Sequence, residues 1–158
     1  MKIVLASDHA GFTLKEIVKE YLMGNGILYE DFGTYNLDPV DYPDFAYKAA
    51  AAVRSGKYDK GILLCGTGIG VAITANKLPG IRAACCSDCF TAQCARSHND
   101  ANILTLGARV VGNGLALKIV DVFLKTPFEG GRHHKRVEKI KELEKFINVE
   151  KKGGAGPV

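Results

Sequence analysis

Short runs of apolar residues alternate along the chain with longer segments in which apolar residues recur every three or four positions. Uninterrupted apolar runs predict buried strands, whereas the three-to-four spacing predicts helices with one buried face. The runs place strands at residues 2–6, 27–32, 62–65, 81–86 and 102–107. The spaced segments place helices at residues 12–23, 45–56, 71–77, 88–98, 115–126 and 132–147.

The order of these elements predicts the fold class. The first helix presents one apolar stripe, made of Leu14, Ile17, Val18, Tyr21 and Leu22, and Asp44 is placed to cap the second helix. Strands that alternate with helices at this spacing form parallel βαβ units with right-handed crossovers. We therefore predict an α/β fold, a single doubly wound, Rossmann-like domain with a five-stranded parallel sheet. The domain spans residues 1–149, and a glycine-rich disordered tail follows at residues 150–158.

Composition narrows the class of protein. The 158 residues, 47% of them apolar and 24% charged, suit one globular domain. No apolar run approaches 18 residues, so no transmembrane helix is expected. Asp8 and His9 interrupt the first apolar run where a signal peptide would continue, which favours a cytoplasmic location. The net charge of +4 is concentrated near the last helix and interleaved with glutamate, a pattern typical of a solvated face and not of a nucleic-acid surface.

The segment GILLCGTGIG, residues 61–70, carries the strongest chemical signal. A strand ends there in a glycine-rich turn that opens a helix, which directs backbone N–H groups and the positive helix end to one point. Cys65 ends the strand beside this point, where a thiolate is favoured as a nucleophile or general base. The turn alone also fits a simpler interpretation, a tight bend beside a small buried cysteine.

Further polar residues flank the other strands. Asp8 and His9 follow the first strand, the segment SHND at residues 97–100 precedes the fifth, and Arg109 follows it. Ligands of doubly wound sheets bind beyond the strand ends, so we expect these residues to form one site. Arg132 and Arg136 share one face of the last helix and suit a phosphate or carboxylate. Alternatively, Asp8 caps the first helix and the arginines are solvated; His133 and His134 are assigned to the surface.

Taken together and in this order, six motifs resemble the ribose-5-phosphate isomerase B family, which includes the galactose-6-phosphate isomerase subunits. They are ASDHAG (6–11), DYPDFA (41–46), GILLCGTGIG (61–70), ANK (75–77), SHNDANILTLGARVVG (97–112) and GGRHHKRVEKI (130–140). The resemblance covers residues 1 to about 147. It implies an enzyme without metal or cofactor that forms homodimers with sites at the subunit interface; a tetramer stays open.

The resemblance also implies roles for individual residues. Cys65 would be the base that moves a proton between C1 and C2 of the sugar, and His98 the acid for ring opening. Thr67 would join the turn N–H groups in stabilising negative charge on substrate oxygens. One branch of the family uses a glutamate just after the turn, where this chain has Val71, so the role of base falls to Cys65. Substrate contacts are expected from Asp8, His9, Gly66, Thr67, Gly68, Ile69, Gly70, Asn99, Arg109, Arg132 and Arg136.

Other functions remain open at this point. A six-carbon phosphosugar, allose or galactose 6-phosphate, could replace ribose 5-phosphate as substrate. A phosphate- or nucleotide-binding module could use the same turn, although the chain has no Gly-x-x-x-x-Gly-Lys-Ser/Thr motif. A cysteine phosphatase or reductase would need a Cys-x5-Arg loop or a second cysteine at that strand end. The other four cysteines, Cys85, Cys86, Cys89 and Cys94, lack the spacing of a zinc site and have no assigned role.

The last helix also predicts a partner. Its apolar positions form a stripe made of Val137, Ile140, Leu143 and Ile147. The helix follows the last strand, where its own sheet offers little surface left to cover, so the stripe is expected to pack on a second subunit.

Overall fold

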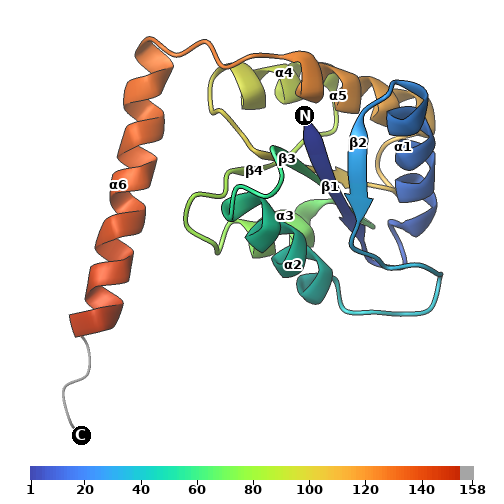
Figure 1. Ribbon diagram of the computed structural model, residues 1–158, viewed down its shortest axis with the longest axis horizontal. Coiled ribbons are helices and arrows are strands. Elements are labelled where there is room, and N and C mark those ends of the chain that lie inside the picture. The colour runs from blue at the N-terminus through green and yellow to red at the C-terminus, as the bar shows by residue number, and fades with distance from the viewer. Residues whose placement is uncertain (154–158) are drawn as a thin grey trace, which may run out of the picture.

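The computed structural model describes the backbone of residues 1–153 and the side chains of residues 1–145. The strands are β1 (Lys2–Ser7), β2 (Leu28–Asp31), β3 (Lys60–Cys65), β4 (Ala83–Cys85) and β5 (Ile103–Gly107). The helices are α1 (Phe12–Gly24), α2 (Tyr42–Arg54), α3 (Ile69–Ala75), α4 (Cys89–Ser97), α5 (Asn113–Lys125) and α6 (Arg132–Gly153). Figure 1 shows how they are arranged around the sheet.

All the strand pairs are parallel, and the order across the sheet is β2-β1-β3-β5-β4. The register places Gly61 opposite Ile103 at one edge, and Cys65 opposite Gly107 at the other. The carboxyl ends of β3 and β5 therefore lie side by side. This sheet confirms the predicted fold class.

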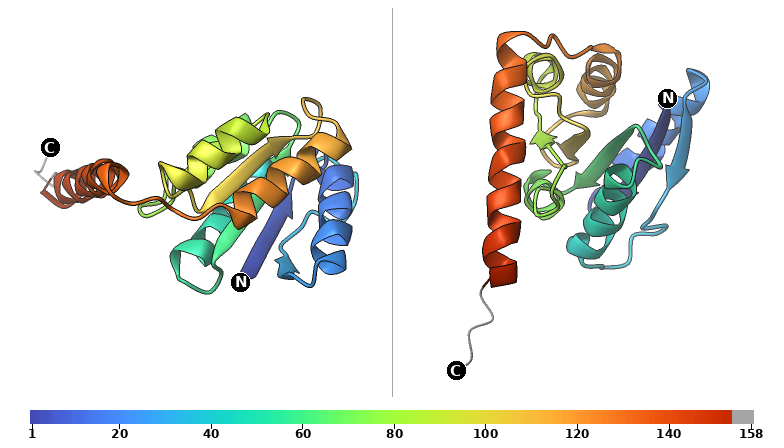
Figure 2. Two further views of the ribbon diagram at one scale, coloured as in Figure 1. Left: turned by 90° about the horizontal axis from the view of Figure 1, so that it is seen from above. Right: turned by 60° about the vertical axis from the view of Figure 1, so that its left-hand side comes forward.

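Helices cover both faces of the sheet (Figures 1 and 2). On one face α1, α4 and α5 bury a core rich in leucine and isoleucine. On the other face α2 and α3 pack mainly alanine against the sheet, which brings their backbones close to it. Successive strand residues alternate between the two cores, as the period-two geometry of a strand requires. Cys65 belongs to the α2/α3 side.

Two details of α2 differ from the prediction. The helix begins three residues earlier than expected, and Asp41 occupies the capping position that we assigned to Asp44. Pro43 lies in the first turn, where a helix tolerates proline because the first N–H groups have no partner within the helix. The earlier start carries Tyr42 to the edge of the sheet.

The last helix, α6, stands apart from the three-layered body formed by the sheet and the helices on its two faces (Figures 1 and 2). It contacts the body through the stacked rings of His133 and His98, and through the Glu144 carboxylate, which accepts a hydrogen bond from the Gly80 N–H at 2.8 Å. Val137 is buried, but Ile140 and Leu143 remain 39% and 61% exposed. Much of the predicted stripe is thus uncovered in the described chain.

The C-terminal end gives a limited test of the predicted tail. Helix α6 continues to Gly153, and residues 154–158 lie outside the described residues, as does the side chain of Ile147. Within the described part of the chain, no helix is both long and apolar enough to cross a membrane.

Candidate active site

A cavity of about 510 Å³ opens at the carboxyl ends of β1 and β3. Apart from Cys65, which ends β3, its lining residues follow β1, β3 and β5 or belong to α2 and α3. The lining residues are Asp8, His9, Ala10, Tyr42, Cys65, Gly66, Thr67, Ile69, Gly70, Ile73 and Arg109. Residues predicted from β1, from the glycine turn and from the segment after β5 therefore meet, as the topology requires.

The Cys65 thiol is held by the glycine turn. Its Sγ accepts a hydrogen bond from the Gly68 N–H at 3.1 Å, and the side chain is buried apart from the face toward the cavity. The hydrogen bond fixes the sulfur at the wall of the cavity, within reach of a molecule bound there.

Gly68 can hold this position because it is glycine. Its φ of +79° lies in the left-handed region, and an added Cβ would stand 2.9 Å from the Leu106 carbonyl carbon. Gly68 is also anchored from below, because the buried Thr105 hydroxyl donates to its carbonyl oxygen at 2.8 Å. Gly68 is therefore held at both of its backbone polar groups, because its N–H bonds the Cys65 sulfur and its carbonyl oxygen bonds Thr105.

Asp8 and His9 line the opposite wall. One Asp8 carboxylate oxygen accepts from the Gly11 N–H at 2.9 Å, which gives the residue part of the helix-start role considered above. His9 Nδ1 accepts from the Val40 N–H at 3.2 Å. A neutral His9 must then carry its proton on Nε2, which leaves that N–H free to donate elsewhere.

Arg109 and Thr67 add polar groups at the mouth of the cavity. Both are exposed, and the Arg109 guanidinium lies against Gly66, 3.4 Å from where a Cβ would stand. Thr67 Oγ1 accepts from the Ile69 N–H at 3.3 Å. The cavity thus combines one thiol, one carboxylate, one imidazole and one permanent positive charge, a set suited to moving protons on a small anionic substrate.

Tyr42 lines the cavity but was not among the predicted site residues. Its ring lies over Gly70, where an added Cβ would come within 2.7 Å of it. The residue belongs to the DYPDFA motif, which carried the resemblance without a role of its own. The fold brings Tyr42 next to Gly70, and no pattern in the sequence predicts this contact.

His98, Asn99, Arg132 and Arg136 do not reach this cavity within the described chain. The loop at residues 97–100 precedes β5, and the register places Ile103 at the amino edge of the sheet, opposite the edge where Cys65 lies. The expectation that this loop shares one edge with the other strand-end residues is therefore wrong for a single chain. Loops before and after a parallel strand lie at opposite edges.

His98, Arg132 and Arg136 instead lie around His133 in a second polar cluster, whereas Asn99 lines a groove beside α6. The His98 ring stacks on His133 with centroids 4.2 Å apart and planes inclined by 3°. His133 is only 5% exposed, so its assignment to the surface was wrong, whereas His134 is exposed as expected. Burial, aided by the nearby His98 and Arg132, lowers the pKa of His133. Arg132 and Arg136 project from the first turns of α6 into solvent beside this pair.

The second polar cluster also contains side chains that commonly bind metal ions. Among the residues that the structure describes, the group with metal-ligand geometry is His98, Glu129 and His133, whose candidate ligand atoms lie within 4.8 Å of one another. The two imidazole planes are almost parallel, however, so their in-plane lone pairs do not converge on one point. The Arg132 Nε also donates to His133 Nε2 at 3.3 Å. This cluster suits an anionic ligand better than a cation.

The four remaining cysteines are also accounted for. Cys85 is exposed, and its Sγ lies 3.8 Å from the Thr67 carbonyl oxygen beneath the glycine turn. Cys86 is buried, and this burial raises the pKa of its thiol to about 11. Cys89 and Cys94 lie on α4 and are partly buried. All five cysteines of the chain are free thiols.

Comparison with known proteins identifies the family of the chain. The model of the ribose/galactose isomerase family matches residues 3–140. Ribose-5-phosphate isomerase B of Escherichia coli (strain K12) is 48% identical over 147 residues, which cover 93% of this chain and 99% of the relative. D-erythrulose-4-phosphate isomerase of Pectobacterium atrosepticum is 46% identical over 144 residues, covering 89% of this chain and 93% of the relative.

A solved structure gives the same result for the fold. Ribose-5-phosphate isomerase B of Clostridium thermocellum superimposes with a TM-score of 0.92 at 55% identity, covering 93% of this chain and 99% of that one. The sequence match and the structural match each extend over nearly the whole of both proteins. The chain belongs to the ribose/galactose isomerase family.

Proposed function

We propose that the protein interconverts ribose 5-phosphate and ribulose 5-phosphate through a cis-enediolate. The observation that carries this proposal is the Cys65 Sγ, held at 3.1 Å from the Gly68 N–H in a cavity that also contains Asp8, His9 and Arg109. The names of two relatives, ribose-5-phosphate isomerase B in E. coli and in C. thermocellum, support the choice of substrate.

The reaction would run through two proton transfers at carbon, linked by one between the oxygens. The Cys65 thiolate removes the proton from C2 of the open-chain aldose, the C–H electron pair forms the C1=C2 bond, and O1 becomes an oxyanion. The O2 hydroxyl proton then moves to O1, and as the C2=O2 carbonyl forms, the C1=C2 electron pair takes a proton from the Cys65 thiol at C1, which gives the ketose. Thr67 and the N–H groups of the turn are suited to stabilise the charge on the oxygens.

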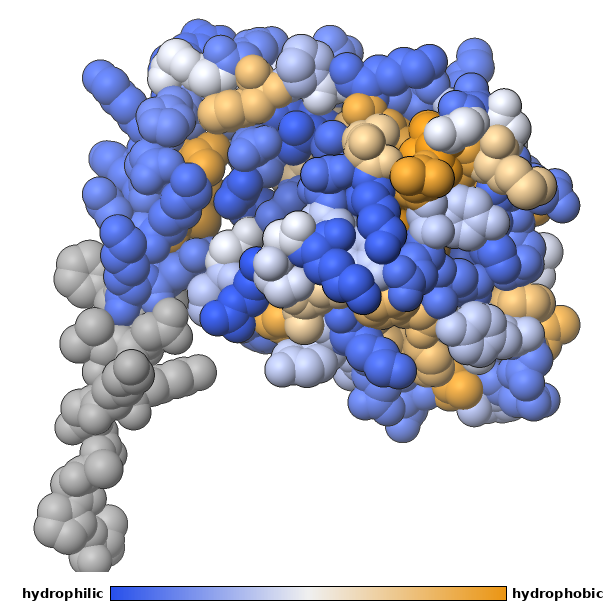
Figure 3. All heavy atoms as spheres, viewed as in Figure 1, coloured by the Kyte–Doolittle hydropathy of each residue, from blue (hydrophilic) through white to orange (hydrophobic). Residues whose placement is uncertain are grey.

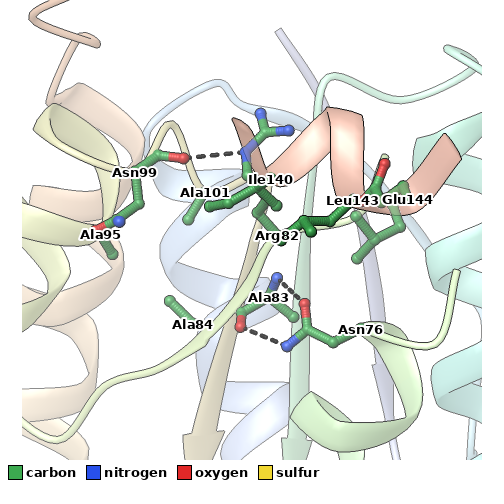
Figure 4. A pocket seen from close by; sticks show the side chains of 11 residues that line it. Asn76, Arg82, Ala83, Ala84, Ala95, Asn99, Ala101, Ile140, Leu143 and Glu144 are labelled. Carbon is green, nitrogen blue, oxygen red and sulfur yellow. Dashed lines mark hydrogen bonds between the residues drawn. The ribbon is translucent and has the colours of Figure 1, made fainter. Parts of the chain in front are cut away.

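The second cluster would bind the phosphate of a substrate held by a partner subunit. Arg132 and Arg136 are exposed, carry permanent charge and lie far from Cys65 within one chain, so they need a second copy to act on the same substrate. A groove of about 440 Å³ between α6 and the sheet edge, lined by Ile81, Ala84, Ile140 and Leu143 among others, leaves apolar surface for that copy to cover (Figures 3 and 4). We infer a homodimer in which each site draws on both chains.

Two comparisons favour sugars of other chain lengths as alternative substrates. The family is described for ribose and galactose, which supports a six-carbon phosphosugar. A relative with 46% identity is a D-erythrulose-4-phosphate isomerase, which supports a four-carbon sugar phosphate.

A cytoplasmic location is proposed as well, because five free thiols suit a reducing compartment.

An isomerase assay on four-, five- and six-carbon aldose phosphates tests this function. Ribose 5-phosphate is expected to give the highest kcat/KM, with at least about tenfold discrimination against the others, since an unfilled or overfilled sugar position costs 1–3 kcal/mol. A metal chelator should leave the rate unchanged. Tight binding of these sugars or of nucleotides with no turnover would favour a binding module instead.

His98 gives a separate prediction. If it serves as the acid that opens the sugar ring, His98→Asn should lower turnover of the cyclic substrate by about 10²-fold or more, the usual contribution of one general acid. Exchange of the C2 proton in a phosphosugar that stays open-chain should change little. Equal losses on both substrates would show that His98 binds phosphate or supports the fold.

A further inference from the structure

Lys15 is among the large side chains that are fully buried in the described chain, and the reaction proposed above does not use it. It lies on α1 beside the apolar residues Leu14 and Val18, at 0% exposure. A buried ammonium group is retained only where charge and hydrogen bonds compensate the loss of water. The partners of Lys15 therefore indicate what it holds in place.

Those partners belong to one loop. Lys15 Nζ donates to both carboxylate oxygens of Asp31, at 2.6 and 2.7 Å, and to the Thr34 carbonyl oxygen at 2.6 Å. The Tyr35 ring covers the ammonium group at 5.1 Å. Burial alone would raise the pKa of Asp31, but the hydrogen bonds from Lys15, the Gly33 N–H and Lys19 hold it below its usual value. Asp31 is thus a carboxylate, and the pair is ionic.

The loop that Lys15 holds is tied to the end of β1. The Ser7 N–H donates to the Gly33 carbonyl oxygen at 2.6 Å, and the Thr34 N–H donates to the Ser7 carbonyl oxygen at 2.7 Å. Ser7 directly precedes Asp8 and His9 in the chain. Fixing residues 33 and 34 therefore fixes the backbone from which both cavity residues project.

Further along, the same loop contacts the His9 imidazole. The Val40 N–H donates to His9 Nδ1 at 3.2 Å, and α2 with Tyr42 follows immediately. The loop thus reaches the cavity at both ends, through Ser7 at its start and through Val40 at its finish. Lys15 is the group that neutralises Asp31 and satisfies the Thr34 carbonyl oxygen between them.

We propose that Lys15 is a positioning residue of the isomerase site, which acts through the loop at residues 33–40 to hold His9 as its Nε2–H tautomer, facing the substrate. The residues that Lys15 Nζ bonds, Asp31 and Thr34, do not line the cavity. The kinetic part of this inference rests on the proposed function, whereas the orientation of His9 does not. The two parts are therefore separable in experiment.

The test uses Lys15→Met, which keeps the length of the side chain and removes its charge. Lys19→Met is the matched control, because Lys19 lies one turn away on α1 and also contacts Asp31, at 3.0 Å, but is 23% exposed and does not bond Thr34. Circular dichroism and thermal melting first establish that each variant is folded at the assay temperature. Asp31→Asn is the second variant for the same measurements if Lys15→Met is not folded.

The first measurement is independent of activity. Imidazole nitrogen shifts in protein with 15N-labelled histidine report the tautomer of His9, whose signals are identified by their absence in His9→Ala. We expect the Nε2–H tautomer in the unmodified protein and in Lys19→Met, and a mixture of tautomers in Lys15→Met, because the Val40 N–H no longer fixes Nδ1. An unchanged His9 in folded Lys15→Met would overturn the proposal.

The second measurement is a double-mutant cycle on kcat/KM. In the wild-type background, Lys15→Met should lower kcat/KM about tenfold or more. This is the size of effect expected when a substrate-contacting residue such as His9 is misplaced by a fraction of an ångström. In the His9→Ala background the same change should cost about twofold or less, since residues that act through one another are not additive. Losses that multiply would mean that Lys15 supports the fold alone and would reject the positioning role.

Discussion

Cys65→Ala is expected to lower kcat by at least about 10³-fold, because it removes the base that the proposed mechanism uses to take the proton from C2. KM should change only a few-fold, since Asp8, His9 and Arg109 remain to bind the substrate. Cys65→Ser, in which the hydroxyl stays protonated at neutral pH, should be almost as slow. Steady-state kinetics with ribose 5-phosphate give both parameters.

A matched control comes from the same chain. Cys94→Ala, on α4 on the other face of the sheet, should keep kcat within about twofold. Iodoacetamide should inactivate the unmodified enzyme, and substrate should slow this inactivation, with mass mapping to separate Cys65 from the exposed Cys85. Turnover by Cys65→Ala close to that of the unmodified enzyme would mean that the base is another group.

Mixing two inactive variants is expected to restore activity if each site draws on two subunits. Cys65→Ala lacks the base, and Arg132→Ala/Arg136→Ala lacks the guanidinium pair of the second cluster. In a heterodimer of the two, one site carries both defects and the other carries neither. Equal amounts, after subunit exchange, should reach about a quarter of the unmodified activity, because half of the dimers then hold one intact site.

The geometry also supplies a pair that should fail to complement. His9 and Cys65 line one cavity of one chain, so a mixture of Cys65→Ala with His9→Ala leaves no intact site in the heterodimer. Subunit exchange is followed independently with two fluorescent labels. If exchange is complete and neither mixture is active, each site is built from a single chain, and the role proposed for the last helix is wrong.

Much of the fold could be predicted from the sequence because it rests on local patterns. Apolar runs and three-to-four spacings located every strand and helix boundary to within three residues except the end of α6, which lies six residues beyond the predicted one, and the alternation of the two gave the parallel sheet. The start of α2 was misplaced because Asp41 and Asp44 are both good capping residues, and Pro43 reads equally well as a loop residue or as part of a first turn. The order of the strands across the sheet was not predicted from these local patterns and is known from the structure alone.

The site could be predicted in part. Residues that follow β1 and β3 met as expected because the carboxyl ends of parallel strands share one edge. Residues 97–100 precede β5, so the predicted parallel topology already implied that they lie at the amino end of the strands, away from Cys65, and grouping them with the other site residues was wrong for a single chain. Lys15 was missed for a different reason. The apolar stripe predicted for the first helix does not include Lys15, and its partner Asp31 lies 16 residues away, so only the folded chain brings them together.

Proton exchange with solvent tests the role of Cys65 most directly. When ribose 5-phosphate is converted in D2O, transfer through a thiol that exchanges with solvent should place deuterium at C1 of the ribulose 5-phosphate, as read by NMR. Cys65→Ala should lose this incorporation together with turnover, while the phosphosugar still binds. Deuterium incorporation at an undiminished rate in Cys65→Ala would contradict the assignment of Cys65 as the base.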